Sequence, residues 1–394
     1  MDHEKGLISR EIFSDPEIYK LELDRIFGRA WLFMCHESQI PNPGDFFQTY
    51  LGEARVLVTR TKSGTVEVLL NTCAHRANTI CKADSGNASS FMCTYHGWTY
   101  NLEGKLVGVP GDKELYGSSV DREQFSLRKA AQVGSYRGFV FATLDPTAPP
   151  LTEFLGPQGR YIIDKFANLG DMQVTPGIIK HRMRCNWKVA VENDEDYYHP
   201  GITHASYLDA LGSSFNEANE AFWSQEGSVV LGEYGHVGDT QAGYDHSSIF
   251  PQMTLLTSSL QILEIRHPKG PQEIENWYFC FENKNATEEE RLAARMNQVR
   301  RVGPAGLVEQ DDGENFELST QGSAVTAVRD APLHYGQGLG QGEIVHDEEL
   351  GFPVLRSKYT TEAYVRWSRR AWADWMEADS WSALQENHAR LGEV

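Results

Sequence analysis

Apolar residues follow a helical period at the start of the chain and a strand period after it. Over residues 14–35 they form a broad helical face, and Asp15 and Pro16 suit the start of a helix. From about residue 38 the apolar positions alternate, as in strands with one buried face. Turn residues such as Lys62-Ser63-Gly64 separate the strands that this pattern predicts, at residues 55–59, 65–70, 99–102, 105–109 and 138–143. We therefore predict an N-terminal helical segment over residues 1–37 and a small all-β domain over residues 38–156.

Helices and strands are mixed in the rest of the chain. Thr287 and Glu290 form a capping box that opens a helix to about residue 301, and Gly303-Pro304 ends it. Extended segments are expected at residues 178–187, 252–265 and 274–282, and further helices at residues 306–320 and 361–384. The pattern predicts a second, α+β domain over residues 157–394, on which the N-terminal helix packs.

Composition excludes several classes of protein. The chain has 394 residues and a net charge of −19, which argues against binding to nucleic acid or to an anionic membrane. No segment approaches the length of about 18 uncharged apolar residues that a membrane helix needs. The N-terminus lacks the features of a secretory signal, so we expect a cytoplasmic protein. The six cysteines do not form a disulfide framework, and three of them cluster between residues 73 and 93.

That cluster has the donor types of a metal site. Cys73 and His75 lie in one loop between predicted strands, and Cys93 and His96 lie in another. Thiolates and imidazoles suit either zinc or an iron–sulfur centre. A zinc site usually pairs Cys with Cys and His with His, whereas a Rieske [2Fe–2S] centre takes one Cys and one His from each loop. The remaining alternative is a pair of buried cysteines beside core histidines, and Cys81 between the loops is expected to be a small apolar residue.

The motif C-x-H-R…C-x-Y-H-G-W resembles the Rieske domain in the large (α) subunit of bacterial aromatic-ring-hydroxylating dioxygenases. The resemblance implies that Cys73, His75, Cys93 and His96 hold a [2Fe–2S] cluster. The family usually has glycine after the arginine, and this chain has Ala77 there. The difference affects the loop backbone and no ligand.

A second candidate metal site lies between residues 186 and 204. His199 and His204 are five residues apart and follow several acids. On an ideal helix five residues turn by about 500°, which leaves the two rings roughly 140° apart. They converge only if the helix breaks, and Pro200-Gly201 is expected to break it. Two histidines and a carboxylate make the facial triad of non-haem Fe(II), although two surface histidines in an acidic loop would give the same pattern.

The resemblance continues here, because E-N-x-x-D-x-Y-H-x-x-x-x-H resembles the catalytic signature of the same family. It implies that His199 and His204 bind a mononuclear Fe(II), with Asn193 and Asp196 as catalytic residues. In the family this Asp links an iron-binding His to a Rieske His of the neighbouring subunit, so Asp196 should pair with His199 and with His96 of the partner subunit. Some relatives have one more residue between the Asn and the Asp.

The third iron ligand is expected near residue 312. Residues 303–315 resemble the family segment G-P-x-G-x-x-E-x-D-D-x-x-N, in which the second Asp is the ligand. The resemblance therefore implies Asp312, with Asp311 as the rival. Without it, acids at the start of a helix would be explained by their interaction with the helix dipole.

The resemblance covers nearly the whole chain and implies the function. The larger domain would be a helix-grip-like catalytic domain, with an antiparallel sheet flanked by helices. The protein would be the terminal oxygenase of an NADH-dependent system that activates O₂ and cis-dihydroxylates an aromatic ring. NADH would act through a reductase, usually with a ferredoxin, since the chain has no glycine-rich dinucleotide fingerprint. The expected assembly is a trimer of α subunits, with a small β subunit as α3β3.

Three alternatives remain open at this point. The same iron site also serves monohydroxylation or demethylation, a Rieske domain alone would make a non-catalytic electron carrier, and a zinc protein would be colourless. Position suggests Asn193, Val302, Leu307 and Val308 as substrate-pocket residues, and the small Val302 and Val308 would admit a larger ring than the bulky aromatics of relatives. A carboxylate substrate would need a cation, for which the candidates are Arg182, Arg184 and Arg266.

Overall fold

Strands dominate both units of the computed structural model, which describes residues 2–210, 212, 223, 225–240, 246–257, 260–388 and 391. One unit spans Phe27–Leu151, and the other joins Met1–Ile26 to Thr152–Val394. The sequence pattern predicts these boundaries at residues 38 and 156. No helix among the described residues is both long and apolar enough to cross a membrane.

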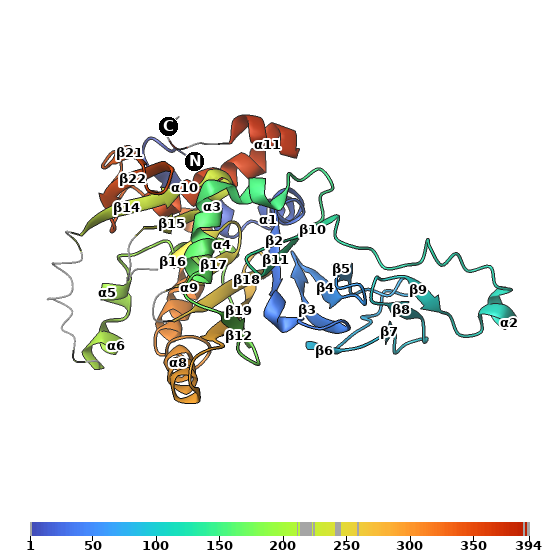
Figure 1. The fold of residues 1–394 in the computed structure, drawn as a ribbon. Helices are drawn as coiled ribbons and strands as arrows, with labels where there is room; N and C mark the ends of the chain where they lie inside the picture. Colours follow the sequence, from blue (N-terminus) through green and yellow to red (C-terminus); the bar gives the residue numbers. More distant parts are fainter. Residues whose placement is uncertain are drawn as a thin grey trace. The chain divides into compact units, whose positions relative to one another are not determined.

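The smaller unit is built from three antiparallel sheets (Figure 1). Their strand orders are β10–β11–β2, β5–β4–β3–β6 and β7–β8–β9. The predicted strands are found as β4 (Ala54–Arg60), β5 (Val66–Leu70), β8 (Thr99–Asn101), β9 (Leu106–Gly108) and β11 (Phe139–Thr143). The others are β2 (Leu32–His36), β3 (Asp45–Leu51), β6 (Ser85–Asn87), β7 (Ser90–Met92) and β10 (Gln132–Tyr136), and the unit also holds the short helix α2 (Asp112–Tyr116).

The predicted N-terminal helix over residues 14–35 is wrong in its second half. Helix α1 (Pro16–Glu22) begins as expected, with Asp15 as its N-cap, and continues as a π-helical turn to Phe27. Residues Leu32–His36 then form β2, which pairs with β11 inside the smaller unit. The apolar run here is buried on both faces of the strand, so it shows neither helical nor alternating periodicity.

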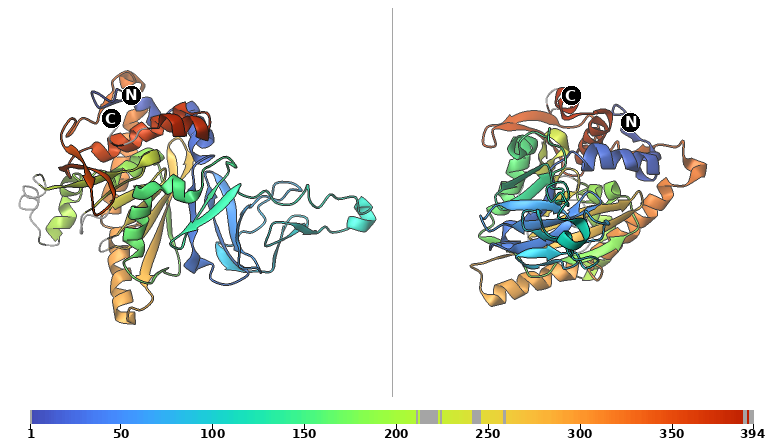
Figure 2. Two further views of the ribbon diagram at one scale, coloured as in Figure 1. Left: turned by 45° about the horizontal axis from the view of Figure 1, so that its top comes forward. Right: turned by 90° about the vertical axis from the view of Figure 1, so that its right-hand side faces the viewer.

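The larger unit is organised around a ten-stranded antiparallel sheet (Figure 2). Its order is β12–β19–β18–β17–β16–β15–β14–β22–β21, and β13 pairs with β19 as well. The strands are β12 (Met172–Val174), β13 (Ile179–Met183), β14 (Glu226–Leu231), β15 (Val237–Asp239), β16 (His246–Ile249), β17 (Met253–Leu256), β18 (Ile262–Gly270), β19 (Glu273–Asn283), β21 (Glu343–Asp347) and β22 (Phe352–Lys358). A short pair, β1 (Leu7–Ile8) with β20 (Leu333–His334), lies outside this sheet.

Helices flank the sheet, and two of them position the candidate iron ligands. α4 (Trp187–Asn193) packs against β18 and against α9 (Glu309–Ser323). α8 (Glu288–Arg301) starts at the predicted capping box. The remaining helices are α3 (Leu151–Ala167), α5 (Pro200–Thr203), α6 (Ala205–Ala210), α10 (Ala363–Glu377) and α11 (Trp381–Asn387).

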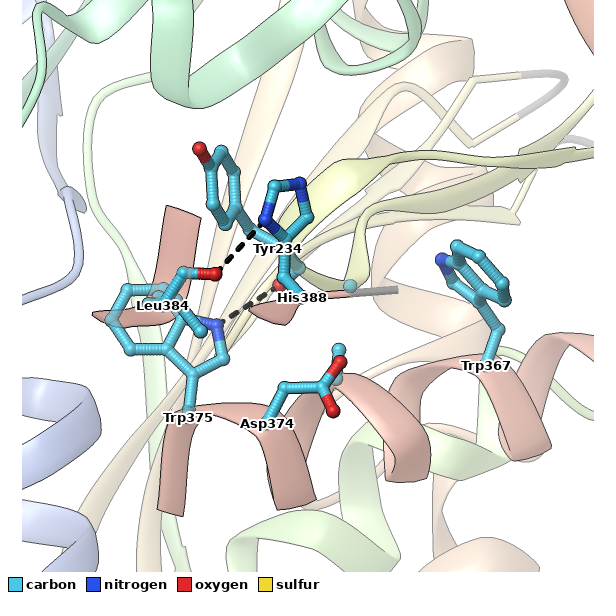
Figure 3. Close-up of a pocket in the computed structure, with 8 residues that line it drawn as sticks. Tyr234, Trp367, Asp374, Trp375, Leu384 and His388 are labelled. Carbon is cyan, nitrogen blue, oxygen red and sulfur yellow. Dashed lines mark hydrogen bonds between the residues drawn. The ribbon is translucent and has the colours of Figure 1, made fainter. Parts of the chain in front are cut away.

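The predicted helix over residues 361–384 is two helices. α10 ends at Glu377 and Ser380 caps α11, because its side chain accepts the N–H of Ala383. Aromatic side chains fill the angle between these helices and the turn at Tyr234. Trp375 donates its indole N–H to the Tyr234 carbonyl at 3.2 Å, and the His388 ring stacks on the Tyr234 ring (Figure 3).

The N-terminal segment is tied to the larger unit by a buried carboxylate. Glu22 is fully buried and accepts the Lys188 ammonium at 2.5 Å. It also accepts the indole N–H groups of Trp187 at 2.8 Å and Trp372 at 2.7 Å. These four side chains fix α1 to α4 and α10.

Candidate metal centres

The two Cys/His loops of the smaller unit have the same backbone turn. The N–H of Cys73 donates to the carbonyl of Asn78, and the N–H of Ala77 donates to the carbonyl of Cys73, both at 2.9 Å. The second loop repeats this from Cys93, with Trp98 and Gly97 in the matching positions. The fourth residue after each cysteine is left-handed, with φ of 56° at Ala77 and 73° at Gly97.

These turns bring the four predicted cluster ligands together. Both cysteine side chains are 2% exposed, and the rings of His75 and His96 lie 4.5 Å apart between centroids. The His75 ring stacks on Trp98 at 4.9 Å, which fixes its orientation. Among the described residues nothing hydrogen-bonds to the buried His75 Nδ1, as expected of an atom that serves as a metal ligand.

Hydrogen bonds prepare the Cys93 thiol for ligation. Burial acts to raise the pKa of the Cys93 thiol, but the backbone of Tyr95 and the amide of Asn78 outweigh it, so the pKa is lowered. The Tyr100 hydroxyl lies 3.4 Å from Cys73 Sγ and accepts the N–H of Ala74 at 3.1 Å. A lowered thiol pKa favours the thiolate, which is the form that binds iron. The donor set therefore fits a [2Fe–2S] cluster held by two cysteines and two histidines.

Sequence reasoning did not assign roles to Asn78, Trp98 and Tyr100, the supporting residues of this site. Trp98 stands in the quoted motif, but nothing in its spacing shows that it stacks on a histidine from the other loop. Cys81 is half-buried and packs against the core of this unit, which agrees with its prediction as a small apolar residue.

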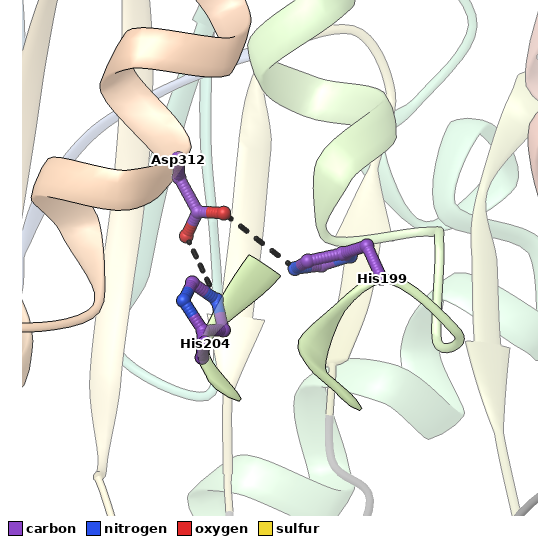
Figure 4. Close-up of side chains that lie close together, drawn as sticks. All are labelled: His199, His204 and Asp312. Carbon is purple, nitrogen blue, oxygen red and sulfur yellow. Dashed lines mark ion pairs between the residues drawn. The ribbon is translucent and has the colours of Figure 1, made fainter. Parts of the chain in front are cut away.

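The second site is a buried triad in the larger unit. Ligand atoms of His199, His204 and Asp312 all lie within 4.8 Å of one another (Figure 4). Asp312 Oδ1 is 3.6 Å from His199 Nε2, and its Oδ2 is 3.3 Å from His204 Nε2. Two imidazole nitrogens and one carboxylate thus surround one face of a position that a metal ion could occupy. This is the facial donor set of a mononuclear Fe(II).

The chain bends at a different place from the one we predicted. α4 already ends at Asn193, and His199 and His204 flank the single turn of α5. Pro200 begins that turn instead of breaking a helix, because its fixed φ and missing N–H suit the first helical position. The prediction that Pro200-Gly201 separates the histidines by ending a helix is therefore wrong, although the rings do converge, at 5.4 Å between centroids.

The outer nitrogen of each histidine has its own acceptor. The Nδ1 of His199 lies 2.6 Å from the carbonyl oxygen of Asp196, and the Nδ1 of His204 lies 3.4 Å from Asp311 Oδ2. Both Nε2 atoms are thereby directed at Asp312. Such partners fix the tautomer and orientation of metal-binding histidines. Asp312 thus stands where the ligand was predicted, and its rival Asp311 orients His204.

The electrostatics of the triad favour a cation. Burial acts to lower the pKa of His199, but Asp196 and Asp312 outweigh it, so the pKa is raised. The negative surroundings that favour a proton on this ring also favour a metal ion. Asn193 donates its amide to Asp312 Oδ1 at 3.2 Å and lies at the same distance from His199 Nε2, so it adjoins both ligands.

The Asp196 carboxylate also contacts His199. One carboxylate oxygen accepts the backbone N–H groups of Tyr198 and His199, each at 3.1 Å, and lies 3.7 Å from His199 Nδ1. The side chain of Asp196 also lines an open cavity of about 410 Å³. Its carboxylate is therefore accessible from outside the iron site.

The predicted pocket residues differ in their exposure. Val302 is buried with Ile262 and Tyr278 in the core of the sheet, Val308 is half-buried just before α9, and Leu307 is 57% exposed. The candidate cations are already paired. Arg182 and Arg184 are exposed beside acids, and Arg266 is buried between acids.

Comparisons with known proteins identify the family of each of the two domains. Residues 30–126 match the Rieske [2Fe-2S] domain family, and residues 172–378 match the ring hydroxylating alpha subunit (catalytic domain) family. The chain is 33% identical to the biphenyl dioxygenase subunit alpha of Paraburkholderia xenovorans (strain LB400), over 98% of this chain and 94% of the relative. It is 31% identical to the benzene 1,2-dioxygenase subunit alpha of Pseudomonas putida, with the same coverage.

Solved structures of related oxygenases have the same fold as this chain. A naphthalene 1,2-dioxygenase variant bound to phenanthrene superposes with a TM-score of 0.87 at 29% identity, over 97% of this chain and 95% of that chain. A quaternary ammonium Rieske monooxygenase shares the fold, with a TM-score of 0.72 at 17% identity over 95% of this chain and 97% of that chain. The expected two-domain α+β fold is confirmed, and the chain belongs to the family of aromatic-ring-hydroxylating dioxygenase alpha subunits.

Proposed function

We propose that this chain is the terminal oxygenase component of an NADH-dependent system that cis-dihydroxylates an aromatic ring. The observation that carries the proposal is that one chain contains both a Cys₂His₂ loop pair and a buried His₂Asp triad. A plain electron carrier would have no use for the triad. When bound, the iron supplies the activation of O₂, and the side chains of the chain supply its geometry.

The protein itself contributes to the reaction by orienting the side chains that would bind iron. Asp196 and Asp311 fix the two imidazoles, and Asn193 holds the Asp312 carboxylate. Cys73, His75, Cys93 and His96 would hold the cluster, and a ferredoxin or a reductase would supply its electrons, since the chain has no dinucleotide fingerprint of its own.

We further propose that the oxygenase is a cytoplasmic trimer of this chain, together with a small β subunit. In such a trimer Asp196 would join His199 to His96 of the partner subunit. The accessible carboxylate of Asp196, on the rim of an open cavity, supports this arrangement.

The primary test combines an electron paramagnetic resonance spectrum with metal analysis, and a turnover assay with an aromatic substrate follows. Anaerobically purified protein should show a reducible [2Fe–2S] signal by electron paramagnetic resonance and about one further iron per chain. With NADH, a reductase and a ferredoxin, an aromatic hydrocarbon under ¹⁸O₂ should yield a cis-dihydrodiol that carries two labelled oxygens. A product with one labelled oxygen would indicate monohydroxylation, and colourless zinc protein would refute the proposal.

The bridging role of Asp196 has its own test. In Asp196→Asn the remaining carbonyl oxygen still accepts the N–H groups of Tyr198 and His199, so both metal centres should form. Turnover should fall by roughly 10–100-fold or more, because the connection between centres is lost. Asp171→Asn, at a carboxylate that is 57% exposed, is the control and should keep normal turnover. Near-normal turnover of Asp196→Asn would exclude the bridge.

A further inference from the structure

Arg266 is a buried arginine that the proposed reaction does not use. It lies on β18, is 2% exposed, and donates its guanidinium to the carboxylates of Asp194 and Glu264, the latter at 2.7 Å. A third hydrogen bond runs to the Thr254 hydroxyl at 2.7 Å. With two acids already bound to it, this guanidinium cannot serve as the counter-ion for a substrate carboxylate.

One arm of this arrangement reaches the end of α4. Asp194 caps that helix and directly follows Asn193, the residue that adjoins both Asp312 and His199. The ion pair with Arg266 therefore anchors the backbone at the point where the chain leaves α4 for the iron ligands.

The other arm reaches the start of α9. Glu264 lies beside Asn276, which donates its amide to the Tyr278 hydroxyl at 2.7 Å, and that hydroxyl adjoins Glu309. Glu309 is the first residue of α9, one turn before Asp312. Each of these side chains is less than 9% exposed. The network therefore joins the two segments that supply the iron ligands.

We propose that Arg266 is a positioning residue for the iron centre, which fixes the end of α4 against the start of α9 through Asp194 and Glu264. Buried ion pairs with good geometry stabilise little on balance, but breaking one leaves an uncompensated buried charge, so the arrangement resists distortion. A planar guanidinium fork sets direction as well as distance, which a lysine ammonium does not. The proposal rests on the iron site proposed above.

The test measures how tightly the triad binds Co(II) after a chelator has removed the mononuclear metal ion from the protein. Co(II) is titrated into this protein in a calorimeter, and the visible absorption of the bound Co(II) reports the geometry of its ligands. In Asp194→Asn and Arg266→Lys the affinity should fall by roughly 10–100-fold, as for other residues that orient metal ligands, and the Co(II) spectrum should change. Arg329→Lys makes the same substitution at an exposed pair with Glu11, and should change neither.

The outcomes separate this proposal from the proposed function. If Arg266→Lys fails to fold, Asp194→Asn decides, since Arg266 there keeps Glu264 as its partner. Variants with the affinity and spectrum of the unaltered protein would overturn the positioning role and leave the oxygenase proposal intact. Unaltered protein that binds no Co(II) at His199, His204 and Asp312 would instead refute the iron site itself.

Discussion

Replacing Ala77 by glycine should stabilise the smaller unit. Ala77 lies in the first cluster loop with φ of 56°. A residue with a Cβ pays about 1–2 kcal/mol in the left-handed region. Glycine removes that strain but adds about 0.4–1 kcal/mol of chain entropy to the unfolded state. The net gain should be about 0.5–1 kcal/mol, or roughly 2–4 °C for a unit of this size.

Ala74→Gly is the matched control in the same loop. Both alanines are exposed, but Ala74 is not among the described residues with positive φ, so glycine relieves no strain there. This variant should lose about 0.4–1 kcal/mol, so the two substitutions should have opposite signs.

The assay is loss of the cluster's visible absorbance on heating, at one scan rate for all proteins. Ala77→Gly should lose its colour at a higher temperature than the unaltered protein, and Ala74→Gly at a lower one. If both variants lose colour earlier, the left-handed strain at Ala77 does not limit stability and the reasoning is refuted.

Three further predictions concern the clusters, the pocket and pH. Cys93→Ser should remove the visible cluster while iron still binds at the triad, as shown by metal analysis; a fully coloured variant would contradict the ligand assignment. Val308→Trp should change the regiochemistry or block larger substrates, and an unchanged product distribution by chromatography would count against Val308 as a pocket residue. His236 is fully buried, accepts the N–H of Phe250 and lies 2.9 Å from the carbonyl of Phe154, and burial lowers its pKa to about 4. Its contribution to stability is complete above pH 6.5 and should be lost between about pH 6.5 and 4, up to about 3 kcal/mol. Thermal melts should therefore show a flatter pH dependence in His236→Gln, and equal slopes would contradict this.

The sequence predicted most of the elements that carry a clear strand or helix signal. The alternating residues of β4 and β5 and the capping box of α8 were placed correctly, because each carries a local signal. Leu32–His36 failed because a strand buried on both faces has no period to detect. The break between α10 and α11 has a local signal, the N-cap Ser380, but it lies within a long Trp-rich run that reads as one helix.

For the metal sites, the resemblance to family motifs supplied the candidate ligands but not the residues that support them. The four loop ligands and the triad stand in recognisable motifs, whereas the partner of each histidine depends on the folded backbone. Arg266 shows the limit most clearly. It shares its strand with Glu264, but its other partner, Asp194, lies 72 positions away in sequence. Only the folded chain distinguishes an arginine that would bind a substrate carboxylate from one that anchors a helix end.

The ion pairs in the core of the larger unit share one structural role, which is to hold α4 in position. Lys188 pairs with Glu22, Arg369 with Glu192, and Arg266 with Asp194, so three buried ion pairs attach one short helix and its cap to three different segments. Desolvation makes such pairs poor sources of stability, and apolar residues of similar volume would hold the fold as well or better. What they provide is a fixed position for α4, whose last residue adjoins the iron ligands. An apolar replacement of a whole pair should therefore leave a folded protein whose metal site is less well ordered, which separates the requirements of the fold from those of the chemistry.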